Sequence, residues 1–115
     1  MINEKFVGEF LGTRVITKYN IYTKETTFTK DLLFYNNVDL GNDQLLVSSI
    51  PSDTFVTTYL LFFNDNENGV FSNSFPIGFD KLVLDENNNL SHYWSSKIDA
   101  FGNLENAKTI LERKN

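Results

Sequence analysis

The chain has 115 residues, of which 41% are hydrophobic and 22% charged, and its net charge is −5. These values fit one globular domain over residues 1–115 and exclude a disordered chain. The absence of cysteine excludes disulfides, thiolate zinc sites and a cysteine nucleophile. Direct nucleic-acid binding is not expected, because the sequence has no long stripe of Lys and Arg.

The first segment, residues 2–11, fits two structures. Large apolar residues recur every fourth position from Ile2 to Phe10, and Asn3 can cap a helix, which favours a short helix. Period-two alternation over the same residues favours a strand. Gly8 in the middle lowers helix stability by about 1 kcal/mol relative to Ala, so we favour the strand.

Period-two alternation continues through most of the chain, which predicts further strands. The expected strands are residues 14–22, 26–35, 44–50, 55–63, 70–75, 81–84 and 90–94. The segments between them are rich in Asn, Asp and Gly, which favour turns. The expected turns are residues 23–25, 36–37, 41–43, 64–69 and 85–89.

The tail has a different pattern. Asn103 can cap a helix that begins at Leu104, and Leu104, Ala107 and Leu111 then form one apolar stripe. Lys108 near the end of this segment suits the helix dipole. The pattern predicts a C-terminal helix that packs on the sheet.

The expected fold class is therefore mainly β, a β-rich α+β protein. About seven or eight strands at regular spacing favour a strongly bent antiparallel sheet or a small barrel, with the C-terminal helix packed on it. The chain has eleven Phe residues, which we expect to fill the core.

Phe10-Leu11-Gly12-Thr13, followed by Ile16 and Tyr19, resembles the opening strand of the phenolic acid decarboxylases, which are lipocalin-like barrels. The resemblance covers about ten residues. It implies a barrel fold. Of the paired strand tyrosines of that family only one has a match, at Tyr19, because Thr17 stands at the partner position, so the resemblance does not carry the family's activity to this chain.

The sequence offers little for catalysis. His92 is the only histidine and alternates with Leu90 and Trp94 on one strand face. A lone strand histidine beside aromatic residues is typical of a structural role, and a general base usually needs an orienting partner. We therefore expect a protein that is not an enzyme, with no cofactor and no metal site.

Two expected hairpin turns carry acidic residues. Asp65 and Glu67 lie in one turn, and Asp85 and Glu86 lie in another. If both turns project from one end of the sheet, they form an acidic rim that can attract a basic protein. We expect this rim, with Tyr93 or Tyr35 as an exposed aromatic anchor, to be the partner-binding surface.

These features predict a non-enzymatic protein-binding module. The expected function is that of a stoichiometric inhibitor, such as a toxin-neutralising immunity protein or a phage-encoded inhibitor, acting on a basic protein by occlusion. One alternative is a lipocalin-like barrel that binds a small ligand. The other is a structural or assembly component of a phage particle.

The expected location is cytoplasmic. Residues 1–10 carry three charges and no apolar run, unlike a signal peptide. No stretch approaches the ~20 apolar residues that a membrane helix needs.

Overall fold

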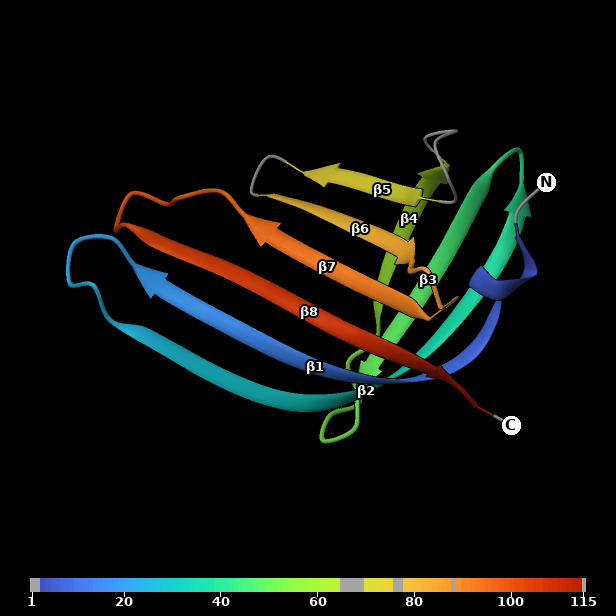
Figure 1. Cartoon of the computed structure of the whole chain (residues 1–115), viewed down its shortest axis with the longest axis horizontal. Coiled ribbons are helices and arrows are strands. Elements are labelled where there is room, and N and C mark those ends of the chain that lie inside the picture. The colour runs from blue at the N-terminus through green and yellow to red at the C-terminus, as the bar shows by residue number, and fades with distance from the viewer. Residues whose placement is uncertain (1–2, 65–69, 76–77, 88, 115) are drawn as a thin grey trace.

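The computed structural model describes residues 3–64, 70–75, 78–87 and 89–114. Within them, eight antiparallel strands follow one another in chain order around a closed barrel, and β8 pairs with β1 to close it (Figure 1). The elements are η1 Glu4–Phe6, β1 Gly8–Asn20, β2 Thr26–Gly41, β3 Gln44–Pro51, β4 Thr58–Asn64, β5 Val70–Phe75, β6 Gly78–Leu84, β7 Leu90–Ser96 and β8 Asn103–Arg113. The expected mainly β, antiparallel fold is confirmed, and of its two expected forms, a strongly bent sheet or a small barrel, the barrel is the one observed.

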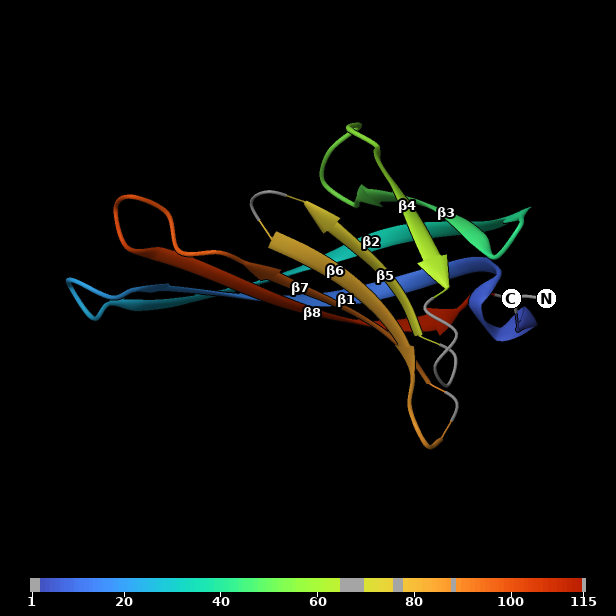
Figure 2. The ribbon, with the colours of Figure 1, turned by 90° about the horizontal axis from the view of Figure 1, so that it is seen from above.

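The strands differ greatly in length, and this shapes the barrel. The long strands β1, β2 and β8 extend past the shorter ones as arms, visible on the left of Figures 1 and 2. The tips of these arms are tied together, since the Asn20 side chain donates to the carbonyl of Phe101 and to Oδ1 of Asn103, both at 2.9 Å. Among the described residues, the β4–β5 contact is the narrowest, with two register pairs.

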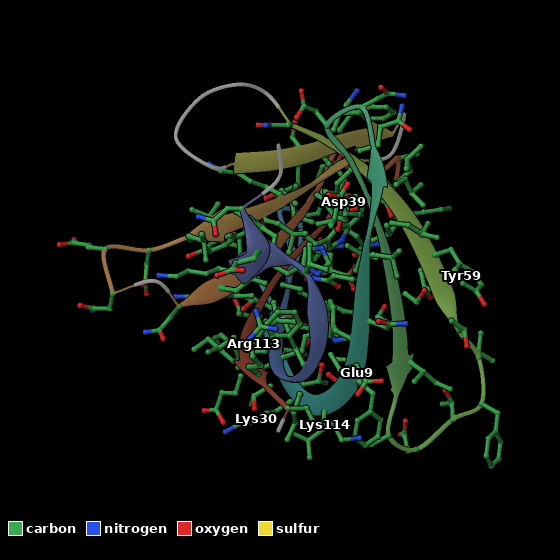
Figure 3. The ribbon with its side chains drawn as sticks, turned by 90° about the vertical axis from the view of Figure 1, so that its right-hand side faces the viewer. Glu9, Lys30, Asp39, Tyr59, Arg113 and Lys114 are labelled. Atoms are coloured by element: carbon green, nitrogen blue, oxygen red, sulfur yellow. The ribbon has the colours of Figure 1, made fainter. Side chains whose placement is uncertain are left out.

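The opposite end of the barrel is closed by η1. The Phe6 side chain of this turn is fully buried, and its carbonyl accepts a 2.9 Å hydrogen bond from Asn37 Nδ2. Arg113 donates to the carbonyl of Val7 at 2.8 Å, and its guanidinium lies 4.8 Å from the ring centroid of Phe10. Figure 3 looks onto this end and shows Arg113 beside η1.

Apolar side chains fill the barrel behind η1. We call this region the filled end. It consists of the buried residues Phe6, Phe10, Leu45, Val47, Phe62, Leu82, Leu90 and Leu111. Burial of this apolar surface is the main source of stability for the fold.

The prediction of a C-terminal helix is wrong. Residues 103–113 form β8, which pairs with β1 over eleven residues and with β7 over six. Ala107, Thr109 and Leu111 point inward as alternate residues of a strand, and Ile110 between them is exposed. Closing the barrel satisfies the backbone hydrogen bonds on both sides of this segment, and that outweighs its helical spacing.

The prediction that the phenylalanines fill the core is also wrong for much of the chain. On β2 the inward residues are Leu33, Tyr35 and Asn37, whereas Phe28 and Phe34 point outward and are 69% and 44% exposed. The reason is the register of the strand, because a shift of one residue exchanges the two faces. The barrel interior is therefore more polar than the sequence suggested.

The local structure at three predicted segments agrees with the sequence analysis only in part. Of the two alternatives for residues 2–11, both occur in part, since Asn3 caps the turn η1 and the strand β1 begins at Gly8. The turn at residues 41–43 is confirmed, with Asn42 and Asp43 at positive φ. The prediction of a turn at residues 36–37 is wrong, because β2 runs through these residues and the Asn37 side chain hydrogen-bonds η1.

No helix among the described residues is long and apolar enough to cross a membrane.

Candidate functional site

A cavity of about 360 Å³ lies inside the barrel, between the filled end and the arms. We call it the barrel cavity. Most of its wall is apolar, and the polar part carries several ionisable side chains. Its lining residues are Arg14, Ile16, Leu33, Tyr35, Ser49, Pro51, Thr58, Leu60, Asp80, His92, Trp94, Glu105, Ala107 and Thr109. This volume falls in the range of small-ligand pockets.

A chain of hydrogen bonds crosses the cavity wall from β2 to β6. The Tyr35 hydroxyl lies 2.7 Å from His92 Nδ1, and His92 Nε2 lies 2.6 Å from Oδ1 of Asp80. With Asp80 as a carboxylate acceptor, His92 carries a proton on Nε2, and in the neutral imidazole Nδ1 then accepts from Tyr35. This arrangement orients a histidine between a carboxylate and a phenol, as acid–base sites do.

Packing around Tyr35 fixes the position of its phenol ring and its protonation state. Tyr35 is 3% exposed, and burial raises its pKa to about 12, although a hydrogen bond from Thr109 acts in the opposite direction. Gly12 makes room for the ring, since a Cβ there would lie 2.8 Å from Tyr35 Cε1 and 2.7 Å from Thr109 Cγ2. The phenol is therefore neutral at physiological pH.

Arg14 is held in the cavity wall by a carboxylate of the next strand. Its Nε donates to Oδ1 of Asp31 at 2.8 Å and its Nη2 to Oδ2 at 2.5 Å. This hydrogen bonding raises the pKa of Arg14 above its usual value. The guanidinium thus stays charged, and its charge is matched by Asp31.

Trp94 and Glu105 lie where the cavity meets a second hollow toward the arms. Trp94 Nε1 donates to Oε2 of Glu105 at 3.0 Å, and Lys18 Nζ lies 3.8 Å from Oε1 of Glu105. Both Trp94 and Glu105 also line a groove of about 670 Å³ formed by Lys18 of β1, the end of β7, the connection to β8 and the start of β8. The two hollows therefore share these side chains as a common wall.

The structure places the predicted acidic rim only in part. Asp85 and Glu86 are exposed in the turn between β6 and β7, where Oδ1 of Asp85 accepts from the backbone N–H groups of Asn87 and Asn89. This is the bonding of a self-contained turn. Asp65 and Glu67 lie outside the described residues, so the rim as a whole stays a prediction.

Tyr93, the predicted aromatic anchor, points outward from the middle of β7 and is 38% exposed. Its register partners are Lys81 on β6 and Lys108 on β8, and Lys108 Nζ lies 5.5 Å from its ring centroid. Tyr93 lies three residues, or about 10 Å at the usual strand rise, beyond Leu90, where β7 begins after the turn with Asp85 and Glu86. Its immediate neighbours are thus basic and not acidic.

The sequence analysis identified His92 but not its partners. The alternation of Leu90, His92 and Trp94 on one face is confirmed, since all three side chains face the interior. Asp80 was missed because the expected strand began at Lys81. Its period-two relation to Leu82 was the available signal.

The prediction of Tyr35 as an exposed anchor is wrong, because this residue is 3% exposed and points into the barrel. Its contact with His92 spans 57 positions of the chain, and only the barrel topology brings the two together.

Comparisons with known proteins add no identity: no family model matches the chain, and no curated protein matches it significantly. Among the described residues there is also no group of three or more His, Asp or Glu side chains that could hold a metal ion.

Proposed function

We propose that this protein binds a small molecule inside its barrel, as a lipocalin-like binding protein does. The observation that carries the proposal is the barrel cavity of about 360 Å³, with its largely apolar wall and a few hydrogen-bonding groups. A barrel of eight strands has an interior wide enough for one small ligand when side chains leave it partly unfilled.

The composition of the wall supports this use. Ile16, Leu33 and Leu60 offer apolar surface for the body of a ligand, while Tyr35 and Arg14 offer polar groups that can fix its orientation. These polar groups are held by their own hydrogen bonds, so they lose little freedom when a ligand binds.

Trp94 makes the proposal directly testable, because it is the only tryptophan and lines the cavity. Cyclohexanol is a suitable probe, since it does not absorb where tryptophan is excited. We expect saturable changes in Trp94 fluorescence and a rise in Tm with probe concentration.

The matched variant is Ala107→Phe, which should fill the cavity from β8 and abolish both responses while the protein stays folded. The outward variant Asn106→Phe on the same strand is the control and should retain them. Equal responses in wild type and Ala107→Phe would contradict binding in the cavity.

A second candidate is the protein-binding inhibitor, and one observation favours it. The outward face of β2 carries a stripe of large apolar side chains that are 41–69% exposed: Phe28, Leu32, Phe34, Val38 and Leu40. Exposed apolar patches of this kind often mark protein contacts. We infer a partner of basic charge, because the chain is acidic overall.

The double variant Phe28→Ser/Phe34→Ser tests the stripe. The inhibitor candidate expects a basic protein to co-purify with the wild type in near-equal amount and to be lost with the double variant. Self-association of the pure wild-type protein, abolished by the same variant, would instead assign the stripe to a homodimer and contradict the inhibitor candidate.

A further inference from the structure

The charges around the barrel cavity allow the class of ligand to be narrowed, provided that the cavity binds a ligand as proposed above. Arg14, Asp80, His92 and Glu105 line the cavity. The positive charge of Arg14 is matched by Asp31, which holds two of its N–H groups. Arg14 therefore offers no surplus positive charge to an anionic ligand.

The two carboxylates in the wall are less completely matched. Glu105 accepts from the neutral indole of Trp94, and its ion pair with Lys18 is long, at 3.8 Å, with Lys18 63% exposed. Such an exposed pair contributes little attraction. Asp80 is bound to His92, which matches its charge only when the imidazole is protonated.

In neither state of His92 does the charge around the cavity favour an anionic ligand. With a neutral imidazole, the two cations Arg14 and Lys18 face three carboxylates, Asp31, Asp80 and Glu105. The surroundings of the cavity then carry one excess negative charge. With an imidazolium they are neutral, so in neither state is a positive charge left over.

Trp94 adjoins both of these carboxylate residues. Trp94 is the register partner of Asp80 on β6 and hydrogen-bonds Glu105 on β8. An aromatic face beside carboxylates is a favourable site for an organic ammonium group, through cation–π attraction and charge pairing.

We propose that the barrel cavity selects a small organic cation, a primary ammonium group on a compact apolar body. The ammonium group lies near Trp94, Asp80 and Glu105, and the apolar body packs against Ile16 and Leu60. An ammonium ligand supplies the positive charge that the cavity lacks, whereas a carboxylate ligand adds to the excess.

Three probes of nearly equal shape test this selection: cyclohexylamine, cyclohexanol and cyclohexanecarboxylate, each titrated at pH 7 and followed by Trp94 fluorescence. We expect cyclohexylammonium to bind at least about tenfold more tightly than cyclohexanol, and cyclohexanecarboxylate to bind most weakly. Equal or tighter binding of the alcohol or the carboxylate would overturn the selection while leaving the proposed function standing. Failure of all three probes to bind would instead contradict the proposed function.

The variant Glu105→Gln tests whether the Glu105 carboxylate causes the preference for the ammonium probe. Its amide oxygen can still accept from Trp94, so only the charge changes. We expect the preference for the ammonium over the alcohol to fall about tenfold, with the affinity for cyclohexanol nearly unchanged.

Glu112→Gln is the matched control, because it removes the same charge from the exposed outer face of β8. The control should keep the full preference. An unchanged preference in folded Glu105→Gln, or an equal loss in Glu112→Gln, would overturn the assignment.

Discussion

The two halves of the barrel interior differ in what fills them. The filled end is packed with Phe and Leu side chains and sealed by η1. The half toward the arms instead places Arg14, Asp80 and Glu105 in the interior and leaves a cavity. The same strands build both halves, since β1 contributes Phe10 to one and Arg14 to the other.

This difference separates stability from binding. Apolar burial at the filled end gains free energy without directional bonds. Each polar group in the other half must be satisfied by a specific partner, and the Tyr35–His92–Asp80 chain and the Arg14–Asp31 pair provide this. We therefore expect substitutions at the filled end to lower stability, and substitutions around the cavity to change binding and pH response.

The largest expected effect lies at the filled end. Phe62 is fully buried and contacts the His92 ring edge-on, with ring centroids 5.8 Å apart. Phe62→Ala should lower the free energy of unfolding by about 3–5 kcal/mol, measured by urea denaturation. Phe79→Ala, on the outward face of β6, is the control and should cost under about 1 kcal/mol. Equal losses would show that the filled end is not the main source of stability.

The next effect concerns the pH dependence of stability. Tyr35 keeps its proton up to about pH 12 in the native state, whereas it ionises near pH 10 when unfolded. The native state then holds more protons, so stability falls as the pH rises from 10 to 12, by roughly 2–3 kcal/mol. Urea denaturation from pH 9 to 11 should show about half of this loss in wild type and a smaller change in Tyr35→Phe. Identical pH profiles would contradict the burial of the phenol.

Gly12→Ala tests how closely the Tyr35 ring packs against Gly12. The added Cβ would lie within 2.8 Å of Tyr35 Cε1 and of Thr109 Cγ2, so we expect a loss of about 1–3 kcal/mol. Thr109→Ser removes Cγ2 and should recover part of this loss in the double variant. If Gly12→Ala were neutral, the close packing around Tyr35 would be disproved.

The smallest expected effect is that of the Arg14–Asp31 pair. Both side chains keep nearly a third of their surface exposed, at 28% and 30%. Asp31→Asn should therefore cost only about 1 kcal/mol in thermal or chemical denaturation. A loss above roughly 3 kcal/mol would mean that Arg14 is held far from water and depends on Asp31 for its burial.

The parts of the structure that could be predicted from the sequence are those that depend on local signals. Strand alternation and turn residues predicted most strands, because these signals are local. For example, the β6–β7 hairpin was predicted correctly from the Asn-rich turn after Leu84. The segment 103–113 was not, because its strand state depends on pairing with β1, which lies about ninety positions earlier in the chain.

The candidate site was harder to predict than the fold. Period-two alternation groups Arg14, Ile16 and Lys18 on one face of the β1 segment, but it does not tell which of the two faces points into the barrel. Only barrel closure turns Arg14 inward and brings Tyr35 to His92. A lone histidine in a strand thus gave no sign of its phenol and carboxylate partners.

Binding of a small ligand in the barrel cavity can be observed residue by residue. The most direct measurement is a titration with cyclohexanol followed by ¹H–¹⁵N NMR, in wild type and in Ala107→Phe. We expect saturable shifts at cavity residues such as Leu33, His92 and Thr109, and no such shifts in Ala107→Phe. Shifts confined to the outer face of β2, or unchanged by Ala107→Phe, would contradict it.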